Sequence, residues 1–95
     1  MFNNMQLSII LPCLNEEQSL KTLIPRLKQT HANAEIIVVD DGSSDGSADV
    51  AAQAGAKVIS HLYSMGNGAA IKSGARAANG DVLVFMVRPV SCKVQ

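Results

Sequence analysis

Residues 36–47 read IIVVDDGSSDGS, and this stretch decides the expected fold. Its first four residues form a continuous apolar run of Ile and Val, which is typical of a strand covered on both faces, as in parallel sheets. Two carboxylates, Asp40 and Asp41, follow directly, and a turn of Gly, Ser and Asp comes next. The stretch therefore predicts a buried strand whose carboxyl end carries acidic side chains.

Three more apolar runs resemble the first, at residues 7–11, 56–59 and 82–86. The segments between the runs predict three helices, over about residues 17–30, 47–54 and 68–79. We expect Pro25 to kink the first helix or end it early, and Gly55 and Gly80 to close the other two. The order βαβαβαβ predicts an α/β fold with a Rossmann-like parallel sheet, helices on both faces, and ligands at the carboxyl ends of the strands.

The composition limits the classes of function. A chain of 95 residues allows one domain, and eight basic against eight acidic residues give a formal net charge of zero. Without a basic excess, we do not expect nucleic acid as a partner. Cys13 and Cys92 have no disulfide-scaffold or zinc spacing, and no apolar run reaches the ~20 residues that cross a bilayer. A reducing, cytoplasmic setting is therefore expected.

A second polar cluster, PCLNEE at residues 12–17, follows the first strand, so it should share an edge of the sheet with Asp40 and Asp41. Carboxylates there could accept hydrogen bonds from a nucleobase imide or ribose hydroxyls. The structural alternative is equally open: Asp40 and Asp41 cap the turn, and Asp45 or Ser47 caps the next helix. Capping of the first helix by Asn15 or Glu16 is the corresponding alternative in the first loop; two adjacent carboxylates exceed what one helix start needs.

Residues 66–73, GNGAAIKS, fit neither a phosphate loop nor a dinucleotide fingerprint, because Ile71 stands where each motif needs glycine. A tight structural turn is favoured over a phosphate cradle, although Lys72 could add a charge to an anion site. His31 and His61 are expected at the surface, since neither has a second ligand at metal spacing. Cys13 is expected to be a small, semi-buried side chain without a nearby activating histidine.

These blocks together resemble the inverting family 2 glycosyltransferases, in particular the dolichol-phosphate and polyprenyl-phosphate sugar transferases, over about residues 6–86. The resemblance implies an A-type glycosyltransferase fold whose N-terminal half, here residues 1–86, binds a UDP- or GDP-sugar. By matching position, the resemblance implies that Pro12, Leu14 and Glu16 line the nucleotide pocket, with Leu14 standing where many relatives have an aromatic residue. It also implies that Asp41 contacts the base or ribose, with Asp40 beside it. The nucleotide site implied by the resemblance consists of Pro12, Leu14, Glu16, Asp40 and Asp41.

The resemblance also implies a metal site, because the family carries an Asp-x-Asp segment after the fourth strand that binds Mg²⁺ or Mn²⁺. Residues 87–95, VRPVSCKVQ, form an atypical tail with no Asp or Glu. We therefore expect no metal ligand and no catalytic residue in this chain. Full-length relatives would transfer the sugar to a lipid-phosphate or glycan acceptor, with lipid-linked acceptors at the inner face of the membrane.

For this chain, the expectation is a truncated and inactive transferase that self-associates through an exposed sheet edge. The alternative is a non-catalytic nucleotide-binding remnant or a regulatory fragment, which would share every motif. A Rossmann-type oxidoreductase is disfavoured, because no Gly-rich fingerprint follows the first strand.

Overall fold

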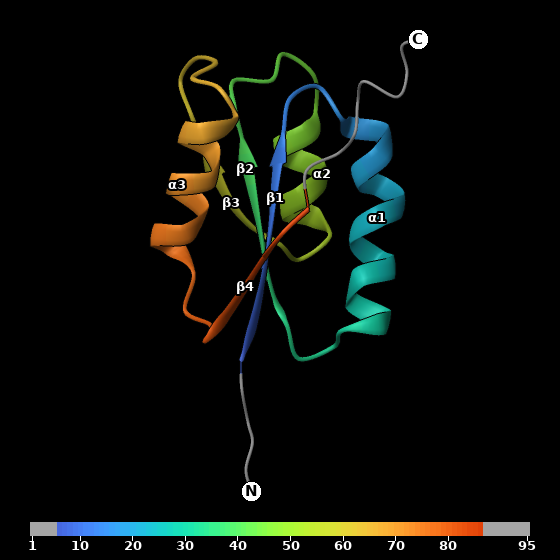
Figure 1. Ribbon diagram of the computed structural model, residues 1–95. Helices are drawn as coiled ribbons and strands as arrows, with labels where there is room; N and C mark the ends of the chain where they lie inside the picture. Colours follow the sequence, from blue (N-terminus) through green and yellow to red (C-terminus); the bar gives the residue numbers. More distant parts are fainter. Residues whose placement is uncertain (1–5, 87–95) are drawn as a thin grey trace, which may run out of the picture.

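The computed structural model describes residues 6–86. Strands and helices alternate along these residues, in the order β1 (Leu7–Cys13), α1 (Glu17–Thr30), β2 (Glu35–Asp40), α2 (Ser47–Gln53), β3 (Lys57–Ser60), α3 (Asn67–Ala77) and β4 (Val82–Phe85) (Figure 1). The strands form one parallel sheet in the order β3-β2-β1-β4. The predicted α/β fold with a parallel sheet is therefore confirmed.

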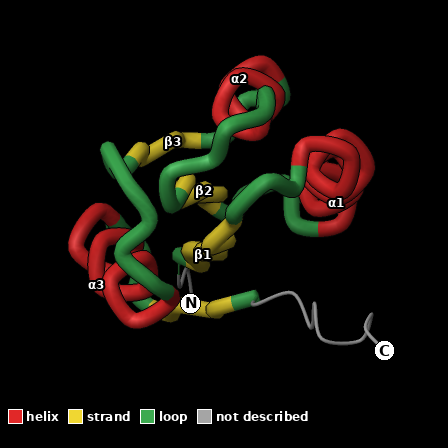
Figure 2. The backbone as a smooth tube through the Cα atoms, turned by 90° about the horizontal axis from the view of Figure 1, so that it is seen from above, coloured by secondary structure: helices red, strands yellow, loops and turns green. Residues whose placement is uncertain are grey.

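Helices cover both faces of the sheet, with α1 and α2 on one face and α3 on the other (Figure 2). Successive residues of β2 point to opposite faces, so Val38 packs toward α1 and α2 while Ile37 and Val39 pack toward α3. All three side chains are fully buried. This two-sided burial explains why the apolar runs of β1 and β2 are continuous instead of alternating with polar residues.

Helix α1 continues through Pro25 to Thr30, so the expectation of an early end is wrong. Ile24 and Leu27 lie on either side of the proline in sequence, and both are buried against the sheet. Pro25 itself is exposed, so the carbonyl that loses its hydrogen-bond partner lies on the solvent side of the helix, where water can satisfy it. Packing of the apolar stripe therefore outweighs the proline.

The two glycines expected to close helices behave differently. Gly55 follows α2 with φ of +95°, the left-handed conformation predicted for it. Helix α3 ends earlier than predicted, at Ala77, because Ala78 is extended (φ −74°, ψ 138°). Gly80 does not close the helix. It lies where the chain passes so close to Ser8 that any side chain would overlap with the serine hydroxyl.

Strand β4 contrasts with the buried centre of the sheet. It pairs with β1, and its side chains Val82, Val84 and Phe85 are 38–40% exposed. No helix within residues 6–86 is long and apolar enough to cross a membrane. The sequence predicts a boundary between a nucleotide-binding half, residues 1–86, and an atypical tail, residues 87–95. The tail lies outside the described residues.

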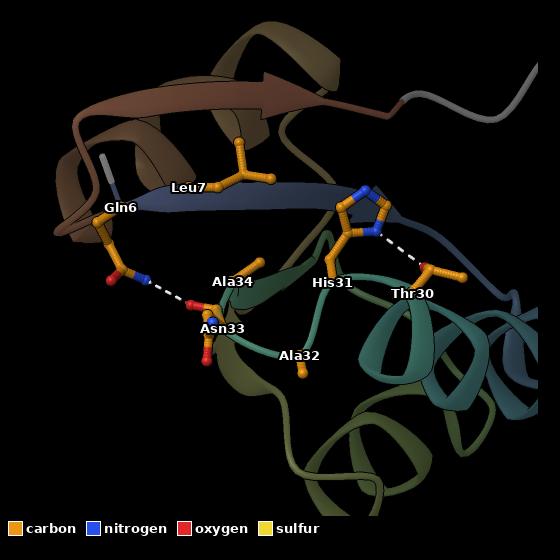
Figure 3. A pocket seen from close by; sticks show the side chains of 7 residues that line it. All are labelled: Gln6, Leu7, Thr30, His31, Ala32, Asn33 and Ala34. Carbon is orange, nitrogen blue, oxygen red and sulfur yellow. Dashed lines mark hydrogen bonds between the residues drawn. The ribbon is translucent and has the colours of Figure 1, made fainter. Parts of the chain in front are cut away.

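A hollow of about 270 Å³ lies at the amino edge of the sheet (Figure 3). Gln6 Nε2 donates a hydrogen bond of 2.8 Å to the Asn33 carbonyl across it, and Thr30 Oγ1 lies 2.8 Å from His31 Nδ1. These partners belong to the start of β1 and to the turn between α1 and β2. The hollow is therefore at the opposite edge from the acidic loops.

Candidate functional site

The loops after β1, β2 and β3 meet at the carboxyl edge of the sheet. The amide of Asp41 donates to the Cys13 carbonyl (2.9 Å), and the amide of His61 donates to the Asp40 carbonyl (2.9 Å). The three loop segments are therefore still hydrogen-bonded to one another where they leave the strands. The structure brings the candidate residues to this edge with unequal exposure: buried Pro12, Asp40 and Asp41, partly exposed Glu16, and exposed Leu14.

Reciprocal hydrogen bonds fasten the first loop to the second. The Asn15 amide donates to Ser43 Oγ (2.8 Å), and Asn15 Oδ1 accepts from the Ser44 amide (2.8 Å). At the start of α1, the Glu16 amide donates to Ser47 Oγ (2.9 Å). Neither Asn15 nor Glu16 caps α1 with its side chain, so that interpretation is wrong. The second loop supplies the acceptors instead.

Glu17 and Asp45 add two more hydrogen bonds between the start of α1 and the loop after β2. Glu17 Oε1 accepts from the Gly46 amide (3.1 Å), while the Glu17 amide donates to Asp45 Oδ2 (3.3 Å). The other oxygen of Asp45 accepts from the Ser47 amide (2.9 Å) at the start of α2. Asp45 therefore accepts from the first amide of α2 and from the first amide of α1. The N-cap position of α2 is Gly46, which has no side-chain cap, so neither Asp45 nor Ser47 is the helix cap in the predicted sense.

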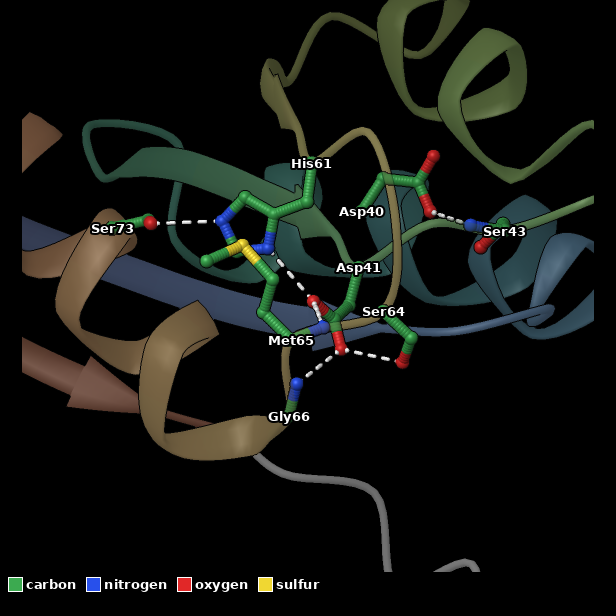
Figure 4. A network of polar contacts seen from close by, with 8 residues as sticks. All are labelled: Asp40, Asp41, Ser43, His61, Ser64, Met65, Gly66 and Ser73. Carbon is green, nitrogen blue, oxygen red and sulfur yellow. Dashed lines mark hydrogen bonds and ion pairs between the residues drawn. The ribbon is translucent and has the colours of Figure 1, made fainter.

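Asp40 is the last residue of β2 and Asp41 follows it, and the two have different surroundings. Asp40 Oδ1 accepts from the Ser43 amide (3.0 Å), which confirms the turn-capping interpretation for this residue. Asp41 lies on the α3 side, in a network that reaches the loop after β3 (Figure 4). Both residues are 6% exposed, so each carboxylate needs polar partners in the fold.

Four donors surround the carboxylate of Asp41. Oδ1 accepts from His61 Nδ1 (2.7 Å) and the Met65 amide (2.9 Å). Oδ2 accepts from the Gly66 amide (2.9 Å) and Ser64 Oγ (3.1 Å). Burial alone would raise the pKa of Asp41, but these hydrogen bonds outweigh it and lower the pKa to about 2. Asp41 is therefore an ionised acceptor at neutral pH.

His61 is part of this network, so its expected surface position is wrong. Its side chain is 9% exposed, and its two ring nitrogens bridge Asp41 and Ser73 of α3. Because a carboxylate only accepts, Nδ1 carries the hydrogen of the 2.7 Å contact, and Nε2 lies 2.9 Å from Ser73 Oγ. His31, in contrast, is exposed as expected.

Two further expectations concern reactive groups. Cys13 is buried, and burial together with the nearby charge of Asp40 raises the pKa of its thiol to about 12, so it is not a nucleophile. Gly66, with φ of +96°, directly precedes α3, and its amide is already bonded to Asp41. This bond favours the structural-turn interpretation of residues 66–73 over a phosphate cradle.

The family model described as Glycosyl transferase family 2 matches residues 8–86, which is most of the chain. This chain belongs to glycosyl transferase family 2. The resemblance drawn from the sequence blocks is therefore confirmed.

Curated relatives of this family 2 chain are much longer than it is. An undecaprenyl-phosphate 4-deoxy-4-formamido-L-arabinose transferase from Photorhabdus laumondii subsp. laumondii is 36% identical over 91 residues, which cover 85% of this chain and 28% of the relative. A 4,4'-diaponeurosporenoate glycosyltransferase from Staphylococcus haemolyticus is 37% identical over 86 residues, covering 84% and 23%. The chain thus spans about a quarter of the length of these relatives.

Solved structures of family 2 enzymes share the fold. Glucosyl-3-phosphoglycerate synthase from Mycobacterium tuberculosis, in complex with Mn²⁺, UDP and glucosyl-3-phosphoglycerate, matches with a TM-score of 0.75 and 30% identity over 87% of this chain and 33% of that one. Mannosyl-3-phosphoglycerate synthase from Rubrobacter xylanophilus matches with a TM-score of 0.78 and 27% identity, covering 90% and 33%. These likenesses confirm the A-type glycosyltransferase fold.

Residues 6–86 contain no group of three His, Cys, Asp or Glu side chains placed to hold a metal ion. Asp40, Asp41 and Asp45 all lie at the carboxyl edge, but their oxygens accept from backbone amides and hydroxyls of the loops. The described side chains therefore do not fit Mg²⁺ or Mn²⁺. The segment where the sequence analysis looked for metal ligands, residues 87–95, is outside the described part.

Proposed function

We propose that the carboxyl edge of this sheet binds the nucleotide of a UDP- or GDP-sugar, and that the chain is the donor-binding part of a family 2 glycosyltransferase. The complete enzyme would transfer the sugar, with inversion, to a lipid-phosphate or glycan acceptor. One observation carries the proposal: acidic loops follow β1 and β2 at the carboxyl edge of a sheet with strand order β3-β2-β1-β4. In parallel sheets, ligands bind at this edge, where the strand order reverses.

The proposed roles of the site residues follow from their exposure and charge. Leu14 is 44% exposed at the edge, so it offers apolar surface to a base. Pro12 lies next to the last residue of β1, and Glu16 lies in the loop that follows the strand, where we propose that both line the pocket. Asp41 is the ionised acceptor for the base or ribose, and Asp40 lies beside it at the end of β2.

The relatives support the substrate class. The mycobacterial synthase is described in complex with UDP and Mn²⁺, and the Photorhabdus relative is named for an undecaprenyl-phosphate acceptor. We extend both to this chain as donor and acceptor classes, with the acceptor presented at the inner face of the membrane. No step of the reaction is assigned to a metal, because residues 6–86 do not fit one.

Titration calorimetry of UDP and GDP, each with and without Mn²⁺, tests the proposal. We expect weak binding of at least one nucleotide and little effect of Mn²⁺, with Asp41→Asn weakening the binding. Thr22→Ala is a suitable control, because Thr22 is exposed on α1 and away from the carboxyl edge. Absence of binding by both nucleotides would contradict the proposal, and tight Mn²⁺-dependent binding would reveal a ligand set beyond residues 6–86.

A non-catalytic nucleotide-binding protein is the second candidate, favoured by the lack of a metal-binding group among the described residues. The two candidates differ in one measurement. Transfer of a radiolabelled sugar from UDP- or GDP-sugar donors by this chain would contradict the second candidate. Light scattering after size exclusion, run beside the assay, tests self-association through β4, whose side chains are exposed.

A further inference from the structure

The carboxylate of Asp41 already accepts four hydrogen bonds within the protein, which limits how a nucleotide can bond to it. This inference rests on the proposed function. A carboxylate has about four acceptor positions, and donors of the loop occupy four on Asp41. A nucleobase N–H can therefore bond to Asp41 only when one of these donors leaves. The identity of that donor determines the cost of binding.

Three of the four donors are fixed by the fold. His61 is buried and is held on its other side by Ser73 of α3. The Met65 and Gly66 donors are main-chain amides, and Gly66 directly precedes α3. Removing any of these three from Asp41 would require movement of the backbone or of a buried ring.

The Ser64 hydroxyl is different. Ser64 is exposed, and its bond to Asp41 Oδ2 is the longest of the four, at 3.1 Å. Rotation about a single side-chain bond moves this hydroxyl away from Asp41 and into water. Ser64 is therefore the donor that leaves at the lowest cost.

The backbone of the loop can stay in place during such an exchange. Gly42, with φ of +85°, lies so close to the backbone of Tyr63 and Ser64 that any side chain at position 42 would overlap with them. This close approach, together with the amides of Met65 and Gly66 on Asp41, holds the loop against the end of β2. The exchange thus requires a rotamer change and no opening of the loop.

We propose that the Ser64 hydroxyl is a stand-in for the nucleobase. It occupies on Asp41 Oδ2 the position that the imide N–H of uracil, or the N1–H of guanine, takes in the nucleotide complex, and it rotates into solvent when the base binds. One hydrogen bond is broken and one is made, so Ser64 lowers the affinity for bases that present such a ring N–H. His61 has the opposite role, because it holds the carboxylate in the orientation that accepts the base.

Calorimetric titration of Ser64→Ala with UDP and with CDP tests the proposal. Loss of the competing hydroxyl should tighten UDP binding by about twofold to tenfold, the equivalent of one net hydrogen bond. CDP should gain nothing, because cytosine has an acceptor nitrogen where uracil has the imide N–H. Ser64→Thr keeps a hydroxyl and should bind UDP like the wild type. Ser60→Ala, at an exposed serine of β3, is the matched control.

The possible outcomes separate this proposal from the proposed function. If the wild type binds UDP and Ser64→Ala binds it equally or more weakly, Ser64 is not a stand-in, although the edge still binds nucleotides. An equal gain for UDP and CDP, or a gain in Ser64→Thr as large as in Ser64→Ala, also overturns it. If no variant binds any nucleotide, both proposals fail. Should Ser64→Ala not fold, Ser64→Gly removes the same hydroxyl and serves instead.

Discussion

Strand β2 has a carboxylate hub at each end, Glu35 at its start and Asp41 just after its last residue. At the amino edge, Glu35 Oε1 accepts from Ser8 Oγ (2.7 Å) and the Asn79 amide (2.8 Å), which joins β1, β2 and the turn before β4. At the carboxyl edge, Asp41 accepts four hydrogen bonds from residues 61–66. Each hub thus joins segments that are distant in sequence, and each has a lowered pKa.

The two hubs differ in burial and in the kind of donor. Glu35 is only partly buried, so water can replace donors that it loses. The side chain of Asp41 is 9% exposed, and so is that of its partner His61. Asp41 also holds a loop with strongly exposed apolar side chains, Leu62 (97%) and Tyr63 (67%). The amino-edge hub therefore stabilises the fold, while the carboxyl-edge hub also shapes a surface that a ligand can reach.

The largest effect should come from Asp41→Ala. This change leaves the His61 ring and two backbone amides without their acceptor in a mostly buried place, which should cost on the order of 3 kcal/mol of unfolding free energy. Urea denaturation followed by circular dichroism measures it. A loss no greater than that of Glu35→Ala would remove the distinction between the two hubs.

Glu35→Ala should have a smaller effect on stability, about 1 kcal/mol, because Asn79 is exposed and water can take the place of the carboxylate. The affinity for UDP should stay unchanged, since Glu35 lies at the opposite edge of the sheet from the proposed nucleotide site. Parallel urea denaturation and UDP titration check both parts. Weaker UDP binding at unchanged stability would show that the amino edge takes part in nucleotide binding.

The dependence of stability on pH should show the contribution of the Asp41 carboxylate. The pKa of Asp41 falls from 3.8 to about 2 on folding, so its contribution is complete above about pH 4 and is lost as the pH falls toward about 2. Glu35 contributes in the same direction, since its pKa is also lowered. Thermal unfolding between about pH 2 and pH 6 should show a shallower acid decline in Asp41→Asn than in the wild type. Equal declines would mean that the hydrogen bonds to Asp41 do not lower its pKa in the folded protein.

Much of the fold could be predicted because it depends on local pattern. The continuous apolar run at residues 36–39 lies within β2, and the stripe that includes Leu20 and Ile24 gave α1 with both ends correct. The errors concern positions where tertiary contacts decide. Pro25 does not end α1 because the residues around it are buried, and α3 ends early because Ala78 is extended and the turn after it is bonded to Glu35 and Ser8.

The site was predictable only in part. Asp40 and Asp41 follow a parallel strand, so the topology alone places them at the edge where ligands bind. Turn capping by Asp40 was also predictable, because its partner Ser43 is only three residues away in sequence. The partners of Asp41 are 20–25 residues away in sequence, and no periodicity connects them to it. A histidine directly after a strand, at the same edge as two aspartates, was the available signal for His61.

The smallest effect should come from Asp45→Asn, which tests whether a carboxylate at this edge matters by its charge or by its place in the network. Asp45 is exposed, and its oxygens accept from the Ser47 and Glu17 amides at the starts of α2 and α1. Asparagine retains one side-chain oxygen and is itself a good helix cap, so the thermal midpoint should fall less than in Asp41→Asn. Affinity for UDP should stay at the wild-type value, because Asp45 serves the helix starts and Asp41 the base. Differential scanning fluorimetry and UDP titration of both variants measure these differences, and equal losses of affinity would contradict the separate roles of the two aspartates.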